Sequence, residues 1–163
     1  MYHLAEDTID HLDQTLRTEN DPFIKSRYVG LISVAAVTVY ELKIKEIFIS
    51  FSTKKHKVLG DFVSKHFERI NGRVSYKNIK DDYVVRFGER YSKRFKKRID
   101  LKEKEFLKLH KKSIVTAYNN VVTWRNQFAH EGKLPSQVTF EEVKDSYYLG
   151  KHVITELQET MQR

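Results

Sequence analysis

Residues 29–40 read VGLISVAAVTVY, the longest apolar run in this chain of 163 residues. Its apolar side chains cover almost every side of a helix, which predicts a helix buried at the centre of a bundle. The run is shorter than the ~20 residues that a helix needs to cross a bilayer, and Arg27 and Glu41 flank it. We therefore expect a core helix in a soluble, cytoplasmic protein that has no membrane partner.

Helical periodicity continues on both sides of this run. Asp21 is predicted to cap the helix that contains it, and Pro22 fits the first turn, so this helix is expected from Pro22 to about Phe51. A preceding helix is predicted to bury one face, which consists of Ala5, Ile9, Leu12 and Leu16. A following helix is expected to end at Asn71 and Gly72. Its apolar face is expected to hold Val58, Phe62, either His66 or Phe67, and Ile70.

The segment from residue 73 to residue 112 differs in charge from the rest of the chain. It holds 15 Lys and Arg against 6 Asp and Glu, a balance of +9, whereas the whole chain carries +8. Apolar residues recur at every fourth position and predict an amphipathic helix with the stripe Phe87, Tyr91, Phe95 and Ile99. Core packing of these aromatic rings is favoured over base stacking. Asp100 and Glu103 resemble a capping box that starts a new helix at Leu101.

A basic stripe accompanies these apolar residues. Either it is a solvated helix face, or it binds the phosphates of RNA. The candidate RNA-binding residues are Arg86, Arg90, Lys93, Arg94 and Lys97.

Two further helices are predicted toward the C-terminus. A break is expected near Ser113, which can cap the penultimate helix, and Gly132 is expected to end that helix. Thr139 and Glu142 form a capping box for the final helix. That helix is expected to bury Val143, Tyr147, Ile154, Leu157 and Met161.

Composition narrows the fold class and the chemistry. The chain contains 6 Gly, 2 Pro and no Cys, and it lacks a convincing alternating strand pattern and a Gly-rich phosphate loop. These absences argue against a disulfide framework, a Cys-ligated zinc site, a cysteine nucleophile and a P-loop enzyme. The sequence predicts one all-α domain over residues 1–163, an up-and-down bundle of five or six helices with a basic helical elaboration at about 73–112.

The end of the penultimate helix carries the residues best suited to chemistry. Residues 124–132 read WRNQFAHEG, in which Arg125 and His130 form an R-x4-H pair. By itself the pair is also compatible with a surface Arg and a His that stabilises the helix C-terminus. Asn126 after the Arg, Ala129 before the His and the helix-ending Gly132 add context to the pair.

This pair suits phosphodiester cleavage in RNA. An imidazole exchanges protons near neutral pH, and a guanidinium binds the charge that develops on the phosphate. On an ideal helix Arg125 and His130 lie about 140° apart. Convergence therefore requires either that the Arg side chain reaches across or that His130 lies past the last regular turn, which Gly132 favours. Asn126, four residues before His130, shares its face and can orient the imidazole or the phosphate.

The segment from Arg125 to His130, with the helical order around it, resembles the signature of HEPN domains. These are α-helical bundles of bacterial toxin–antitoxin, anti-phage and RNA-processing systems. The resemblance implies a single HEPN-like domain and a metal-independent endoribonuclease. It implies a homodimer with a composite site, in which Arg125 and His130 are catalytic and Asn126 supports them. It also implies 2′,3′-cyclic phosphate and 5′-hydroxyl ends, no cofactor and no metal, and RNA and an antitoxin or defence protein as partners.

Two features leave alternatives open. Glu41 is either a polar group between helices or a further site residue, for which Arg125 or His130 would be a natural partner. Many HEPN toxins carry a modifiable Tyr two residues after the His, where this chain has Gly132. Besides the nuclease, the sequence allows a non-catalytic HEPN module that binds RNA or one that binds another protein.

Overall fold

The computed structural model describes residues 2–70, 72–132 and 137–162, with only the backbone for Leu4. Its α-helices are α1 (His3–Thr18), α2 (Pro22–Lys55), α3 (Lys57–Phe67), α4 (Tyr76–Asn78), α5 (Glu89–His110), α6 (Ile114–Glu131) and α7 (Phe140–Met161). A π-helical turn, η1 (Ile79–Tyr83), and a 3₁₀ turn, η2 (Val84–Phe87), connect α4 to α5. The described residues form no strand, so the predicted all-α class is confirmed.

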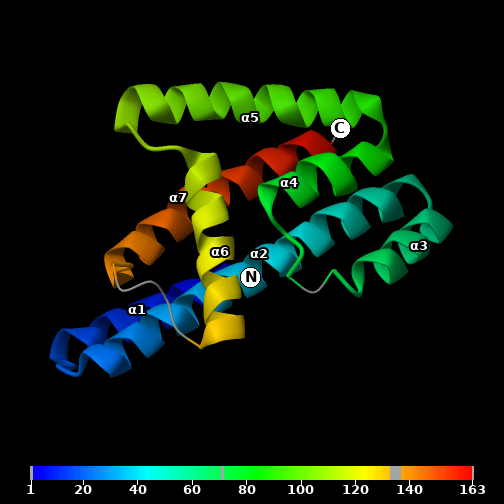
Figure 1. Ribbon diagram of the computed structural model, residues 1–163. Helices are drawn as coiled ribbons and strands as arrows, with labels where there is room; N and C mark the ends of the chain where they lie inside the picture. The colour runs from blue at the N-terminus through cyan, green and yellow to red at the C-terminus, as the bar shows by residue number, and fades with distance from the viewer. Residues whose placement is uncertain (1, 71, 133–136, 163) are drawn as a thin grey trace.

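Helix α2 is the centre of the bundle. It packs against α1, α3, α6 and α7, and Figure 1 shows α1, α2 and α7 side by side with α6 crossing them. Its start was predicted correctly, because the Asp21 carboxylate accepts a hydrogen bond of 2.8 Å from the Phe23 N–H and Pro22 is the first helical residue. No described helix combines the length and the apolarity that a membrane span would need.

A stack of three tyrosines joins α2, α6 and α7. The ring of Tyr40 lies 4.9 Å from that of Tyr118 and 5.6 Å from that of Tyr147, and its hydroxyl donates to the Tyr147 carbonyl oxygen. Burial raises the pKa of Tyr40 and Tyr118 well above 10, so both hydroxyls remain protonated donors. These contacts fix α6, and therefore its C-terminal end, relative to the central helix.

Helix α3 differs from the prediction in its length and in which of its faces is buried. It ends at Phe67 rather than near Ile70, and its buried residues are Gly60, Val63 and Phe67. Gly60 lies against Thr53 of α2, where the absence of a side chain allows close approach. Residues two positions on either side of Gly60 point about 200° away from it. For this reason Val58 and Phe62, expected to be buried, are exposed. Of the two residues predicted to end α3, Asn71 lies outside the described residues, and Gly72 lies five residues beyond Phe67 with φ +79°.

The basic segment folds as η1, η2 and α5, with two departures from the prediction. Gly88, at φ +103°, separates Phe87 from α5, so the apolar stripe does not lie on a single helix. Helix α5 also continues through Asp100, so the predicted capping box is wrong. The Glu103 carboxylate accepts hydrogen bonds of 3.0 and 3.2 Å from the N–H groups of Ile114 and Val115. It therefore satisfies open donors at the start of α6 rather than at a helix start of its own.

The remaining helix boundaries follow the predicted caps. The Ser113 hydroxyl accepts a hydrogen bond from the Thr116 N–H, and the Thr139 hydroxyl accepts one from the Glu142 N–H. Helix α7 buries all five of the residues expected on its apolar face. The end of α6 was also predicted correctly, because Gly132 adopts a left-handed conformation at φ +68°.

Candidate functional site at the end of helix α6

His130 lies in the last turn of α6 and is exposed to solvent. Helix α6 is regular through Glu131, and the Gly132 N–H donates to the Phe128 carbonyl oxygen at 2.9 Å. His130 therefore stands within the helix, so the expectation that it lies past the last regular turn is wrong. The reason is that the helix needs a left-handed residue to end, and Gly132 provides it.

Arg125 is half-buried, and its guanidinium lies against the segment that follows α3. Its Nη1 donates a hydrogen bond of 3.0 Å to the Asn126 side-chain oxygen. The guanidinium lies against the backbone of Gly72, where an added Cβ atom would overlap with Nη1. Gly72 also has φ +79°, which other residues adopt only at a cost. Arg125 therefore depends on a glycine that is remote in sequence.

Glu41 of α2 reaches the same glycine from another side. Its Oε2 accepts a hydrogen bond of 2.8 Å from the Gly72 N–H, and its Oε1 pairs with Lys45 at 2.8 Å. Within the described part of the chain, Glu41 pairs with neither Arg125 nor His130. The structure thus brings Glu41 and Arg125 together indirectly, through one backbone position.

The segment from Gly72 to Tyr76 is fixed against α6. The Tyr118 hydroxyl donates a hydrogen bond to the Val74 carbonyl oxygen, and the Tyr76 N–H donates one of 3.1 Å to the Asn119 side-chain oxygen. The Tyr83 hydroxyl donates a hydrogen bond of 2.6 Å to the Arg73 carbonyl oxygen. Burial, together with the charge of Asp82, raises the pKa of Tyr83, which keeps its donor proton. Arg73 is exposed beside this rigid backbone.

Two contacts with α2 hold the C-terminal end of α6. Arg27 donates a 2.5 Å hydrogen bond to the Gly132 carbonyl oxygen. The ring of Phe128 covers Gly30, where a Cβ atom would overlap with the ring carbons. No local pattern marks Arg27, Gly30 or Gly72 as neighbours of the end of α6, because their partners are distant in sequence. Only the requirement of Gly72 for a positive φ leaves a signal, since a lone glycine after a helix is typical of such a turn.

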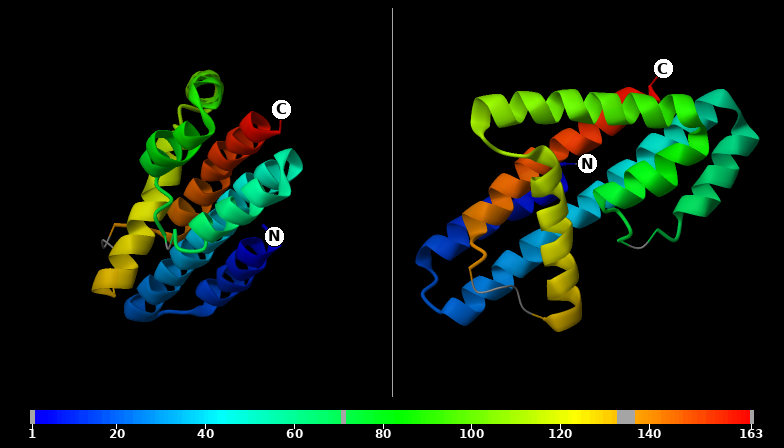
Figure 2. Two further views of the ribbon diagram at one scale, coloured as in Figure 1. Left: turned by 90° about the vertical axis from the view of Figure 1, so that its right-hand side faces the viewer. Right: turned by 45° about the horizontal axis from the view of Figure 1, so that its top comes forward.

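Most of the proposed RNA-binding residues lie far from His130. Helix α5 passes over the beginning of α6, and Figures 1 and 2 show it at the opposite end of α6 from the C-terminal turn. His130 lies 16 residues after Ile114, the first residue of α6, which corresponds to ~24 Å along the helix axis. In a single chain, Arg90, Lys93, Arg94 and Lys97 therefore do not border the R-x4-H pair.

The side chains of the basic stripe have different surroundings. Lys93 pairs with Glu89 at 2.8 Å, whereas Arg90, Arg94 and Lys97 form no ion pair with a described residue. Arg86 is not part of α5, and its guanidinium pairs with Asp82 and contacts His66. The break at Gly88 therefore separates Arg86 from the other four residues.

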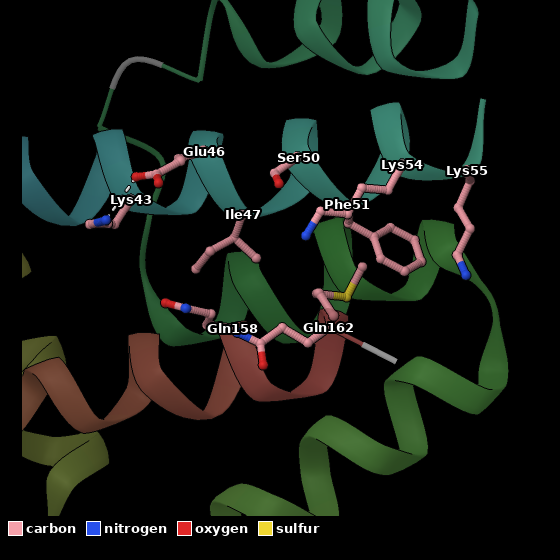
Figure 3. Close-up of a pocket in the computed structure, with 10 residues that line it drawn as sticks. Lys43, Glu46, Ile47, Ser50, Phe51, Lys54, Lys55, Gln158 and Gln162 are labelled. Atoms are coloured by element: carbon pink, nitrogen blue, oxygen red, sulfur yellow. Dashed lines mark hydrogen bonds and ion pairs between the residues drawn. The ribbon is translucent and has the colours of Figure 1, made fainter. Parts of the chain in front are cut away.

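Two further observations concern other candidate sites. A pocket of about 160 Å³ lies between α2 and the end of α7, and Figure 3 shows Lys54, Lys55 and Gln158 among its lining residues. It is remote from the R-x4-H pair and has no assigned role. Among the described residues, no three His, Asp or Glu side chains are grouped closely enough to hold a metal ion.

Comparison with known families agrees with the helical fold. The family described as RiboL-PSP-HEPN matches residues 2–163, nearly the whole chain. No curated protein and no solved structure shows a significant match. The match confirms the resemblance to HEPN domains. The chain therefore belongs to the RiboL-PSP-HEPN family.

Proposed function

We propose that this protein is a metal-independent endoribonuclease that acts as a homodimer in a toxin–antitoxin or anti-phage defence system. Membership of the HEPN family favours a nuclease or another RNA-related function. The observation that carries the proposal is the R-x4-H pair at the end of α6, with His130 exposed and Arg125 fixed by Asn126 and Gly72.

The two side chains have complementary roles in the proposed reaction. The 2′-oxygen of a ribose attacks the adjacent phosphorus and gives up its proton to a base, while the bond to the 5′-oxygen breaks and that oxygen takes a proton from an acid. The products carry 2′,3′-cyclic phosphate and 5′-hydroxyl ends. Imidazole serves as base or acid at neutral pH. Arg125 uses one N–H for Asn126, and its other donors remain to bind the phosphate as negative charge develops.

The proposed dimer follows from the proton balance. Cleavage requires a base and an acid together, and the motif of one chain supplies one imidazole. A second copy would supply the other His130, in a composite site between the two chains. Sedimentation at micromolar concentration is expected to show a dimer, and a monomer alone would contradict this part of the proposal.

The test of catalysis is RNA cleavage in the presence of EDTA. The parent protein is expected to cleave RNA, and His130→Ala is expected to abolish cleavage. His11→Ala is the matched control, because His11 is exposed on α1 and plays no part in the proposed site. Cleavage that is absent in the parent, or unchanged in His130→Ala, would contradict the nuclease.

A second candidate function is a non-catalytic HEPN module that binds RNA or a partner protein. It is favoured by one observation, namely that Arg125 contacts Asn126 and Gly72 rather than His130. This candidate predicts RNA binding or a stable complex with another protein, without cleavage that depends on His130. An antitoxin or defence partner would co-purify with the protein under either function, so the EDTA assay is the discriminating measurement.

A further inference from the structure

Helix α3 carries an exposed apolar surface beside a pocket. Phe62 is 69% exposed and Leu59 is 40% exposed, although both are apolar residues on a short helix. They line a pocket of about 330 Å³ between α3 and η2, together with Phe51, Phe67 and Phe87. Its volume and its aromatic walls suit a flat, mostly apolar group.

The pocket also has a polar part, formed by His66 and Arg86. Arg86 is held by Asp82 through Nε and Nη2, and its Nη1 lies 3.1 Å from His66 Nε2. A guanidinium only donates hydrogen bonds, so His66 Nε2 takes part in this contact only as an acceptor. Aromatic walls with a few placed donors are typical of a site that binds a ring system bearing carbonyl and amino groups.

One tyrosine connects this pocket to the candidate active site. The ring of Tyr83 packs edge-on against Phe67 of the pocket wall, with the ring centres 5.2 Å apart. Its hydroxyl donates a hydrogen bond of 2.6 Å to the Arg73 carbonyl oxygen. Arg73 follows Gly72, whose backbone lies against Arg125. The buried side chain of Tyr83 and the backbone of Arg73 and Gly72 therefore connect the pocket wall to the guanidinium of Arg125.

The charge of the surrounding segment favours a polyanion. Residues 54–73 contain six Lys and Arg against two Asp and Glu. One of the two acids, Glu68, is paired with Lys65 at 2.7 Å. Lys57, Arg69 and Arg73 are exposed and form no ion pair with a described residue. Proteins that bind single strands combine such a basic track with aromatic side chains on which bases stack.

We propose that the pocket between α3 and η2 binds an unpaired base of single-stranded RNA whose backbone passes over Arg73 to Arg125. The inference rests on the proposed function and gives it a substrate class, an RNA strand with unpaired bases near the cleaved phosphate. Phe62 stacks on the base, and Arg73 binds a phosphate. The pocket thus contributes to the choice of the cleavage position.

The test measures binding rather than cleavage, in the His130→Ala background. The probes are a fluorescent single-stranded oligouridine and a sugar–phosphate strand of the same length without bases. Phe62→Ala is expected to weaken oligouridine binding about tenfold, the order expected when one base no longer stacks, and to leave binding of the abasic strand unchanged. Arg73→Gln is expected to weaken binding of both probes, because both carry phosphates.

The matched control is Val58→Ala. Val58 is 67% exposed on the same helix and does not line the pocket. It is expected to bind both probes like the parent. Because Phe62 and Val58 are exposed, both variants are expected to fold, and their thermal unfolding is measured alongside binding.

The possible results distinguish the base pocket from the nuclease. Equal oligouridine affinity of Phe62→Ala and the parent, or no oligouridine binding by the parent, would overturn the base pocket. In the first case the pocket would fit an apolar side chain of a protein partner instead. Base-dependent binding that requires Phe62, in a protein that never cleaves RNA, would uphold the pocket and contradict the nuclease. Cleavage that requires His130, together with unchanged oligouridine binding by Phe62→Ala, would uphold the nuclease and contradict the pocket.

Discussion

The guanidinium of Arg125 rests on the backbone of Gly72, so closely that a Cβ atom at Gly72 would overlap with Nη1. Glu41 accepts a hydrogen bond from the N–H of the same glycine. A residue of the central helix and a residue of the R-x4-H motif thus meet at one point of a connecting segment. The position of Arg125 is therefore decided by two parts of the chain that the motif does not contain.

Gly72→Ala is expected to displace Arg125 and to reduce RNA cleavage on the order of 10²-fold, as misplaced catalytic groups do. The matched control is Gly88→Ala, because Gly88 also has a positive φ but has no atom near the added Cβ. Each substitution is expected to cost about 1–3 kcal/mol of folding free energy through backbone strain. Single-turnover cleavage and thermal unfolding distinguish the two effects. Equal activity of the two variants would contradict the role of Gly72.

Glu41→Ala is expected to lower cleavage about tenfold, because the Gly72 N–H loses its acceptor. Glu41→Gln retains an oxygen that accepts this hydrogen bond and is expected to retain most of the activity. Lys45→Met serves as the control for the ion pair alone. If Glu41→Gln proved as inactive as Glu41→Ala, the carboxylate charge would be needed in the reaction itself, and the positioning role would be incomplete.

Charge reversal at Arg90 and Arg94 tests the basic face of α5. If this face binds RNA phosphates, the double variant binds RNA more weakly. The slope of log affinity against log salt would then fall by about 0.7 for each phosphate of a single strand that the variant no longer neutralises. Because these residues lie far from His130 within one chain, the rate of the chemical step is expected to stay unchanged. If RNA affinity depended on salt in the same way for variant and parent, the basic face of α5 would be a solvated surface that does not bind RNA.

The stability of the fold is expected to fall as the pH decreases below about 6.5, the ordinary pKa of a histidine. Burial, and then the charge of Lys102, lowers the pKa of His152, while Glu156 and Glu105 act in the opposite direction. A lowered pKa means that the unfolded chain binds the proton more tightly than the folded protein does. The free energy of unfolding therefore decreases as the pH falls below the unfolded pKa of His152, and it is not reduced by this group above that pKa. His152→Gln is expected to reduce the difference between urea unfolding at about pH 7.5 and about pH 5.5. A difference equal to that of the parent would refute this assignment.

Local sequence patterns predicted the helices well where the stabilising groups are close in the chain. Asp21, Ser113 and Thr139 cap their helices through N–H groups two or three residues away, and Gly132 ends α6 through its own φ. The pattern failed at α3, where the close approach of Gly60 to Thr53 decided which face is buried. It also failed at Glu103, whose carboxylate reaches the start of the next helix.

The sequence alone determined that the chain is a helical bundle of the HEPN type and that Arg125, Asn126 and His130 lie together on one helix end. Periodicity, caps and a six-residue motif are local properties, so they can be read without the fold. The tertiary structure alone decided that Arg125 turns toward Gly72, that Glu41 meets it there, and that most of the basic stripe lies at the other end of α6. These relationships depend on how α2, α3 and α6 pack, and packing is set by shape and burial between residues far apart in the chain.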